Sequence, residues 1–357
     1  MGKQKIFLIS NMYPSDGNPS FGTFIKTIAE DLENDFVVEK MVPNFNIQSR
    51  LVRYLAFWIK VILRGLRIKK DVVYCHYCSH SFPALVVLFF LGRLQRLVVH
   101  IHGSEITREH GVSYFKSKIK LYVTGLAVRK AIICVVPSKY YYDKVVSLWP
   151  KYRCKIVISP SGGVPIPCAL PSNFTNTWNP LKMVYVGRLV EDKGVITMCE
   201  AIRRVIDNID KQITLTIIGD GPLRSIISRY GFVEIIGSFE HSMVMELIRD
   251  NSILVFPSER ESESLGLVGI EGMANGLIVV SSDVGGPSTY IEDQNTGFLF
   301  KAGSSESLAA TLLAVIKTNP RTLIKVRENA YRRAQEYDSH KVGSKFRKII
   351  LDAFYGS

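Results

Sequence analysis

The strongest constraint on the fold is a repeated alternation of short apolar runs with longer segments of helical periodicity. Runs of this kind are typical of parallel strands that are covered by helices on both faces. We therefore predict an α/β protein with two doubly wound, Rossmann-like parallel-sheet domains that face each other across a cleft at the carboxyl ends of the strands. The runs that predict strands are Ile6–Ser10, Val72–Tyr74, Leu97–His102, Ile132–Pro137, Ile156–Ser159, Met183–Val186, Thr214–Ile218, Val233–Ile236, Ile253–Phe256, Ile278–Ser281 and Gly297–Phe300.

A proline-rich segment divides this pattern into two halves. Four prolines lie between positions 165 and 180, within a stretch that ends in polar residues, and such a composition is typical of a linker. With 357 residues the chain is long enough for two ordinary domains. We expect an N-terminal domain over residues 1–165, a hinge over 166–180, a C-terminal domain over 181–337, and a C-terminal helix over 338–357 that packs back on the first domain.

Two carboxylates, Glu263 and Glu271, lie eight positions apart where a loop is predicted to become a helix. The run Ile253–Phe256 stops at Pro257 as a buried strand would, and helical spacing resumes from Leu267 onward. A helix start offers free backbone N–H groups and a positive end to phosphate, while sugar hydroxyls can donate to carboxylates. The segment therefore suits a ligand with both groups, such as a sugar nucleotide.

Two other interpretations of the carboxylate pair remain open from the residues alone. A glutamate near a helix start often only caps the helix or balances its dipole. Alternatively, the pair supplies the acid and the nucleophile of a glycosidase, which requires carboxyl groups about 5 to 10 Å apart. Eight helical positions rise about 12 Å, so the hydrolase is disfavoured.

Two cations follow another predicted strand of the second half. Arg188 and Lys193 lie on a loop with Gly187 and Gly194, directly after the run Met183–Val186. Arginine can bind a pyrophosphate through two parallel hydrogen bonds, and lysine adds a point charge. The loop is therefore suited to a diphosphate leaving group.

Three weaker signals lie near other predicted strand ends. Gly221 belongs to the turn Gly219-Asp220-Gly221, which is as consistent with a plain turn as with a nucleotide contact. Gly22 precedes a predicted helix and permits close approach of a ligand, although this signal alone favours a simple tight turn. His102 ends a strand, where a histidine is more often structural than catalytic.

Positive charge is concentrated in the first half of the chain. Residues 1–170 contain 24 Lys and Arg against 10 Asp and Glu, whereas the remainder contains 21 against 22. A nucleic-acid partner is not expected, because no stacking strand with interleaved aromatic residues and no recognition-helix pattern is present.

Residues 50–70 contain seven basic residues and no acidic one. At helical spacing the basic residues share one face, and Trp58 and aliphatic residues occupy most of the other positions. This pattern predicts a helix that lies on an anionic membrane surface, with a buried helix that has a solvated basic edge as the alternative. The apolar run Phe82–Leu91 is too short to span a bilayer, and it is either a buried helix or part of the same surface.

The cysteines favour a reducing compartment. Six cysteines show no disulfide-framework spacing, and the N-terminus lacks the cleavage site of a signal peptide, so we expect a cytoplasmic protein. The cluster Cys75-His76-Tyr77-Cys78-Ser79-His80 could suggest a metal site, but a single such pair at the end of a buried strand is weak support, and no metal is expected.

Taken together, these motifs resemble the GT-B-fold glycosyltransferases of the retaining glycosyltransferase family 4 (glycosyl transferases group 1). The resemblance spans nearly the whole chain and rests on the order and spacing of its pieces. Departures from the family pattern are Glu105 in place of Asp, Ile278 in place of Pro, Thr289 in place of Glu, and two extra residues before Glu263. The matching pieces are Phe21-Gly22, His102-Gly103-Ser104-Glu105, Ser161-Gly162-Gly163-Val164, Gly187-Arg188 with Lys193-Gly194, Gly219-Asp220-Gly221-Pro222, Glu263 with Glu271, Gly285-Gly286 and Thr296-Gly297-Phe298-Leu299.

The resemblance implies a role for each matching residue. Glu263 would accept hydrogen bonds from the donor sugar, Glu271 would bind the ribose, and Arg188 and Lys193 would stabilise the departing diphosphate. His102 would lie near the sugar. The remaining donor-binding positions would act mainly through their backbone, and they are Gly22, Gly187, Gly221, Ser264, Leu265, Gly266 and Leu267. The family transfers sugars with retention and without a required metal or cofactor.

The expected function is a retaining, metal-independent glycosyltransferase that is peripheral on the inner face of the cell membrane. It would move a sugar from a nucleotide-diphosphate donor, with UDP-sugar as the best choice, onto a lipid-linked glycan acceptor in surface polysaccharide biosynthesis (O-antigen, capsule or exopolysaccharide). Three alternatives are kept. The same chemistry could act on a soluble phosphorylated acceptor, the chain could be a non-catalytic membrane-surface subunit that binds sugar nucleotides, or it could be a sugar-nucleotide epimerase. Glu261 is a rival to Glu263 for the first carboxylate.

Overall fold

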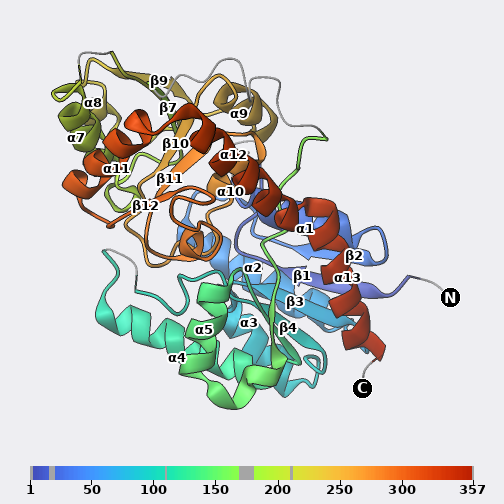
Figure 1. The fold of residues 1–357 in the computed structure, drawn as a ribbon. Helices are drawn as coiled ribbons and strands as arrows, with labels where there is room; N and C mark the ends of the chain where they lie inside the picture. The colour runs from blue at the N-terminus through green and yellow to red at the C-terminus, as the bar shows by residue number, and fades with distance from the viewer. Residues whose placement is uncertain (1–2, 16–20, 109–110, 169–180, 210–211, 356–357) are drawn as a thin grey trace. The chain divides into compact units, whose positions relative to one another are not determined.

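The protein folds into two compact units, shown in a computed structural model (Figure 1). The structure describes residues 3–15, 21–108, 111–168, 181–209 and 212–355. Unit 1 comprises Met1–Gly163 with His340–Ser357, and unit 2 comprises Val164–Ser339. Residues 169–180 of the expected hinge lie outside the described residues.

Each unit contains one six-stranded sheet flanked by helices. The strands are β1 (Lys5–Ile9), β2 (Val37–Met41), β3 (Val72–His76), β4 (Leu97–His100), β5 (Ile133–Val136) and β6 (Ile156–Ile158) in unit 1, and β7 (Lys182–Val186), β8 (Thr214–Ile218), β9 (Val233–Gly237), β10 (Ile253–Phe256), β11 (Ile278–Ser282) and β12 (Phe298–Phe300) in unit 2. The helices are α1 (Thr23–Leu32), α2 (Arg50–Gly65), α3 (Cys78–Phe90), α4 (Tyr114–Lys130), α5 (Lys139–Leu148), α7 (Val195–Ile206), α8 (Arg224–Ile227), α9 (His241–Ile248), α10 (Leu267–Ala274), α11 (Ser305–Lys317), α12 (Pro320–Ala334) and α13 (Ser339–Tyr355), with short 3-10 turns η1 (Pro150–Lys155), η2 (Glu191–Lys193), η3 (Gly286–Thr289) and η4 (Gln335–Tyr337).

The strand orders fix where a ligand can bind in each unit. The sheet of unit 1 has the order β2-β1-β3-β4-β5-β6, and that of unit 2 has the order β12-β11-β10-β7-β8-β9, with all neighbouring pairs parallel. The order reverses between β1 and β3 in unit 1 and between β7 and β10 in unit 2. Ligands of open α/β sheets bind at such switch points, beyond the carboxyl ends of the strands. The predicted doubly wound α/β fold with two parallel sheets is therefore confirmed.

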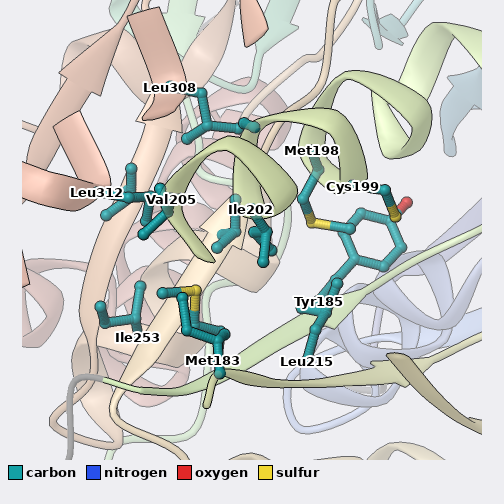
Figure 2. Packing of buried hydrophobic residues seen from close by; sticks show 14 of the residues in the cluster. Met183, Tyr185, Met198, Cys199, Ile202, Val205, Leu215, Ile253, Leu308 and Leu312 are labelled. Carbon is teal, nitrogen blue, oxygen red and sulfur yellow. The ribbon is translucent and has the colours of Figure 1, made fainter. Parts of the chain in front are cut away.

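Both faces of the sheet in unit 2 are buried, which explains why its strands are continuous apolar runs. Alternate residues of β7 point to opposite faces, so Met183 and Tyr185 pack against α7 and α11 while Val184 packs with α10 and α12. Figure 2 shows the first of these layers, where Ile202 and Leu312 meet the strand residues.

Every predicted strand is present within a few residues of its expected bounds, and one strand was missed. The missed strand is β2, which lies at the sheet edge and pairs only with β1 among the described strands. Its residues are mostly half-buried or exposed, and Glu39 and Lys40 interrupt the apolar run. An edge strand with one solvated face therefore lacks the continuous apolar signal on which the other predictions depended.

The C-terminal helix α13 returns to unit 1, beside α1 in Figure 1. Its Phe346 and Ile350 are buried in the same cluster as Ile25 and Ile28. Arg347 pairs with Asp31 of α1, and its Nε lies 2.8 Å from an oxygen of Asp35. Gly343 fits against Asp31, where a Cβ atom would lie 2.3 Å from a carboxylate oxygen. The helix therefore contributes to the core of unit 1 as well as to its surface charge.

Candidate functional site

The switch point of unit 2 brings together the loops that follow β7 and β10. Lys193, at the end of η2, places its Nζ 2.5 Å from Oε2 of Glu263, and the two side chains keep only 18% and 15% exposure. The hydroxyl of Ser258 donates to the same oxygen at 3.2 Å. Two residues that the sequence placed on separate motifs, 70 positions apart, therefore form one ion pair at the expected ligand position.

This ion pair keeps Glu263 ionised. Burial alone would raise the pKa of Glu263, but the charge and the hydrogen bond of Lys193, followed by the charge of Arg260 and the hydroxyl of Ser258, outweigh it. The pKa of Glu263 therefore lies below its ordinary value. A carboxylate in this state can accept hydrogen bonds from hydroxyl groups at neutral pH.

Glycines allow the two loops to approach so closely. Gly194 has a φ of 66°, and a Cβ atom there would lie 2.0 Å from the carbonyl oxygen of Pro257. A Cβ atom on Gly285 would lie 2.7 Å from the carbonyl oxygen of Glu263, and the N–H of Gly286 donates to that carbonyl at 2.8 Å. These glycines position the backbone on both sides of Glu263.

The segment 259–262, which carries the two extra residues, holds the Lys193 loop. The Nε of Arg260 lies 2.6 Å from a carboxylate oxygen of Asp192, the residue before Lys193. The N–H of Glu259 donates to the carbonyl of Asp192 at 3.0 Å, and its carboxylate accepts from Thr197 at 2.7 Å. Glu261 is exposed, so the structure places Glu263 rather than Glu261 against Lys193.

Helix α10 begins four residues after Glu263. Gly266 precedes the helix with a φ of 75°, a conformation that favours glycine. The first N–H groups of a helix have no partner one turn earlier, and that of Gly269 donates instead to the carbonyl of Gly266 at 2.9 Å. Leu265 is buried and Ser264 is half-buried, so these positions offer backbone rather than large side chains. The arrangement suits an anionic phosphate.

Glu271, on the buried side of α10, is paired with a residue that the sequence analysis missed. The Nε2 of His241 lies 2.7 Å from Oε1 of Glu271, which is 6% exposed, while the side chain of His241 is 45% exposed. The hydrogen bond with Glu271 raises the pKa of His241 above its ordinary value, against the opposing effect of burial. His241 begins α9 just beyond the carboxyl end of β9. Its place directly after a predicted strand was the sequence signal that could have marked it as a candidate site residue.

Tyr290 is buried beside the start of α10. Its hydroxyl donates to the carbonyl of Gly266 at 2.8 Å, and it occupies the space that a side chain on Gly269 would need. Burial raises the pKa of Tyr290, and the charges of Glu263 and Glu271 both raise it further. Both carboxylates are therefore within electrostatic reach of one buried hydroxyl at the start of α10.

Arg188, Gly187 and Gly221 lie on neighbouring loops of the same sheet edge. Arg188 is exposed, and its carbonyl accepts from the hydroxyl of Tyr185 at 2.8 Å. A Cβ on Gly219 would lie 1.9 Å from the carbonyl oxygen of Gly187, and one on Gly221 would lie 2.5 Å from that of Leu189. The glycines are therefore required where the loops after β7 and β8 cross, whether or not they contact a ligand.

In unit 1, the start of α1 lies close to His102. Gly22 precedes α1 with a φ of 81°, and a Cβ there would lie 3.1 Å from the backbone nitrogen of Tyr13. The ring of Phe24 lies 5.0 Å from the ring of His102, and the N–H of His102 donates to Glu105 at 2.9 Å. Glu105 is therefore an acceptor that fixes the turn after His102.

His102 belongs to a buried group of three histidines that the sequence did not predict. The Nδ1 of His76 lies 2.9 Å from the Nε2 of His102, and the Nδ1 of His100 lies 2.6 Å from the hydroxyl of Tyr74. The three histidines are nearly or fully buried. Burial lowers the pKa of His100 to about 3 and holds those of His76 and His102 well below their ordinary value. All three rings are therefore neutral at pH 7.

The geometry of this group is that of a hydrogen-bonded stack. The rings of His76 and His102 are 10° apart in plane with centroids 5.1 Å apart, as expected for two rings joined edge to edge by a 2.9 Å N–H···N bond. The ring of His100 lies against that of His102, with centroids 4.1 Å apart and planes 25° apart. Imidazoles that share a metal ion direct in-plane lone pairs to one point, so this layering does not resemble a metal site.

These histidines predict a stability loss in acid. Their folded pKa values are depressed, so below the unfolded value of about 6.5 the unfolded state binds more protons and unit 1 loses stability. Between pH 7 and 5.5 each group contributes a loss on the order of 1 kcal/mol. Hydrogen exchange of β3 and β4 measures this, and His100→Gln should reduce the pH dependence by about a third. The same slope in the variant would contradict the assignment.

Comparison with known proteins shows similarity to glycosyltransferases. Residues 174–336 match the family model described as glycosyl transferases group 1. A glycogen synthase of Mycobacterium tuberculosis is 25% identical over 319 residues, which cover 85% of this chain and 76% of the relative. The putative teichuronic acid biosynthesis glycosyltransferase TuaC of Bacillus subtilis is 23% identical over 354 residues, covering 86% and 88% of the two chains.

A solved structure supports the fold across both units. Anabaena Alr3699/HepE, crystallised in complex with UDP and glucose, matches with a TM-score of 0.73 over 98% of this chain and 100% of that chain, at 18% identity. At this identity the match supports the fold alone. Residues 174–336 therefore match the family model of glycosyl transferases group 1, and the chain has the GT-B fold.

Proposed function

We propose that this protein is a retaining glycosyltransferase that moves a sugar from a UDP-sugar onto a lipid-linked glycan acceptor in surface polysaccharide biosynthesis. The observation that carries the donor part is the ion pair of Lys193 and Glu263 at the switch point of unit 2, beside the N-terminus of α10. The complex of Alr3699/HepE with UDP and glucose supports the choice of nucleotide, and the name of TuaC supports the polysaccharide class.

The donor would lie across the two carboxylates. Hydroxyls of the sugar donate to Glu263, the diphosphate accepts from the N–H groups at the start of α10, and the ribose donates to Glu271. Lys193 and Arg188 neutralise the charge that develops on the diphosphate as its bond to the anomeric carbon breaks. The charge stabilisation is assigned to these side chains and the helix end, so the reaction is proposed to need no metal ion.

Glu263 acts in this proposal as a hydrogen-bond acceptor for the sugar rather than as a nucleophile. One of its oxygens already accepts from both Lys193 and Ser258, which reduces its reactivity and fixes its orientation. The acceptor hydroxyl supplies the oxygen that bonds to the anomeric carbon, the bond from that carbon to the diphosphate breaks, and the hydroxyl proton passes to the departing diphosphate, so that UDP leaves. His102, neutral at pH 7, is assigned a hydrogen bond to the sugar from unit 1.

The acceptor part of the proposal rests on unit 1. The basic segment 50–70 corresponds largely to α2, and four of its aliphatic residues at a spacing of four are exposed rather than packed inward: Leu51, Leu55, Ile59 and Leu63. An exposed apolar stripe beside basic residues suits an anionic membrane surface. Within the described residues, no helix combines the length and hydrophobicity needed to cross a bilayer. We therefore propose peripheral binding to the inner face of the cell membrane.

A panel of nucleotide sugars tests the donor assignment. UDP-sugars at 100 times their dissociation constant should stabilise the protein by about 2.7 kcal/mol, measured as a shift in thermal unfolding. GDP- and ADP-sugars serve as comparisons. Stabilisation by one of these alone would contradict the choice of UDP, and the absence of any shift would contradict the donor site itself.

Acceptor assays separate the proposal from its alternatives. Transfer to a lipid-linked glycan in vesicles supports it, whereas turnover of a free phosphorylated acceptor without lipid or detergent would support a soluble acceptor instead. Binding of the donor with neither transfer nor donor hydrolysis would indicate a non-catalytic binding subunit. Conversion of the donor into its epimer would indicate an epimerase.

A further inference from the structure

Helix α4 exposes an aromatic face to which neither the fold nor the donor site assigns a role. The side chains of Tyr114, Phe115, Ile119 and Tyr122 are 63%, 73%, 48% and 69% exposed. The opposite face is packed, since Val123, Ala127 and Val128 are buried in unit 1. Four large apolar or aromatic residues on one exposed helix face are far more than scattered surface hydrophobics, and such patches mark interaction surfaces.

This face is continuous with α3 and α2. Helix α3 lies between the other two: Leu88 of α3 fills the space beside Gly65 of α2, and the Nζ of Lys130 of α4 lies 4.4 Å above the ring of Phe89 of α3. The outward residues of α3 are apolar as well, with Phe90 at 81% exposure. Three neighbouring helices therefore expose apolar side chains on one side of the sheet.

The charge of the three helices has one sign. Helices α2, α3 and α4 contain no Asp or Glu in their sequences. Helix α4 carries Lys116, Lys118 and Lys120 in the half that bears the aromatic residues, and the Nζ of Lys118 lies 5.2 Å above the ring of Tyr114. Apolar and aromatic residues interleaved with lysines match the acyl and headgroup layers of an anionic lipid surface.

We infer that the outward face of α4, through Tyr114, Phe115, Ile119 and Tyr122, is a second membrane anchor that binds an anionic lipid bilayer together with α2. The inference rests on the proposed membrane-bound function, and it adds a separate helix to that contact. Two anchors on one face fix the orientation of unit 1 on the membrane, which a single helix lying on the surface does not. A single weak anchor also gives only marginal membrane binding, so a second one has a thermodynamic role.

Vesicle sedimentation tests the second anchor. Wild type, Phe115→Ser/Tyr122→Ser on α4, and Leu55→Ser/Ile59→Ser on α2 are compared on phosphatidylcholine vesicles with and without 30% phosphatidylglycerol, a composition of roughly physiological surface charge. Phe239→Ser, at a 40% exposed phenylalanine of unit 2, is the matched control. The α4 variant should lose at least about tenfold in partition to the anionic vesicles, as should the α2 variant, while the control stays at wild-type level.

The outcomes separate this inference from the proposed function. Loss in the α2 variant with none in the α4 variant overturns the second anchor and leaves the proposed membrane association intact. Absence of binding by the wild type overturns both, although transfer to a detergent-solubilised acceptor would still support the enzyme. A wild-type dimer in sedimentation equilibrium that the α4 substitutions dissociate would assign this face to a second copy of the chain and overturn the inference.

A fluorescent variant gives an independent readout that does not depend on loss of function. In Phe115→Trp, addition of anionic vesicles should shift the tryptophan emission of the variant to shorter wavelength beyond any change in wild type, and brominated acyl chains should quench it. Emission that is unchanged on vesicles that sediment with the protein would contradict insertion of α4. Unaltered thermal unfolding of each variant checks that the exposed substitutions leave the fold intact.

Discussion

Lys193→Ala is expected to lower the rate of sugar transfer by at least about 100-fold, the loss typical for removal of one preorganised charge from a transition state. The side chain serves two purposes, since it faces the predicted diphosphate position and pairs with Glu263 at 2.5 Å. Its removal takes away the charge that stabilises the leaving group and frees Glu263 from its fixed orientation. Steady-state kinetics with a saturating donor measure the effect, and it should appear mainly in kcat.

Stability measurements distinguish catalysis from folding in this variant. Lys193→Ala leaves a mostly buried carboxylate unpaired, which should cost about 2 kcal/mol, less than for a fully buried pair because both side chains keep some exposure. The double variant Lys193→Ala/Glu263→Gln should recover most of that stability but none of the activity. Lys182→Ala, at an exposed lysine that begins β7, is the control and should be neutral. Near-wild-type transfer by Lys193→Ala would refute the role of this lysine.

The pH dependence of this pair follows from the lowered pKa of Glu263. A carboxylate with a depressed folded pKa contributes stability above its unfolded value of about 4.5, and that contribution is lost as the pH falls through the folded pKa. The donor site should therefore remain intact across the neutral range. Acid destabilisation between pH 7 and 5.5 is assigned to the three buried histidines of unit 1, because the raised pKa of His241 makes its protonation stabilising instead.

Glu271→Ala should abolish stabilisation of the protein by UDP, which is about 2.7 kcal/mol for wild type at 100 times the dissociation constant. The carboxylate is 6% exposed and one oxygen is engaged by His241, so the other oxygen is assigned to the ribose. Thermal unfolding with and without UDP gives the result directly. The effect should appear with UDP alone, because the assignment concerns the nucleotide rather than the sugar.

Three comparisons make this prediction specific. Glu261→Ala, at the exposed rival carboxylate, should retain the full shift. Glu271→Gln keeps an acceptor for His241 but loses the charge, and it should bind UDP more weakly than wild type and more tightly than Glu271→Ala. His241→Ala should weaken UDP binding only modestly if its role is to hold Glu271. A full UDP shift in Glu271→Ala would rule out the ribose assignment.

The fold was predictable because strands that are buried on both faces of a parallel sheet are nearly continuous apolar runs in the sequence. Strands such as Ile253–Phe256 are apolar at every position, and they were located within a residue or two. Strand β2 was not predicted because Glu39 and Lys40 interrupt its apolar run at the edge of the sheet. The exposed apolar face of α4 was not predicted for a related reason. Apolar residues lie on both its outward and its inward face, so its sequence lacks an amphipathic pattern, and only the structure shows which face is exposed.

The sequence indicated the candidate residues of the site, but it did not indicate which of them pair in the structure. Motif order indicated that Lys193 and Glu263 share a ligand, while their direct ion pair depends on the switch point between β7 and β10, which the sequence does not state. His241 was missed because a histidine at the start of α9 has no motif around it. Arg260 was treated as part of an insertion, whereas its contact with Asp192 makes it a support for the Lys193 loop.

The most direct test of the account is transfer of a labelled sugar from UDP-sugar by the purified protein on anionic vesicles that contain a lipid-linked glycan. We predict label in the lipid extract in equal amount to the UDP released, with the anomeric configuration of the donor retained in the product by NMR. Lys193→Ala should abolish both. Release of UDP with only free sugar, an inverted product, or no reaction with any UDP-sugar would contradict the proposed function.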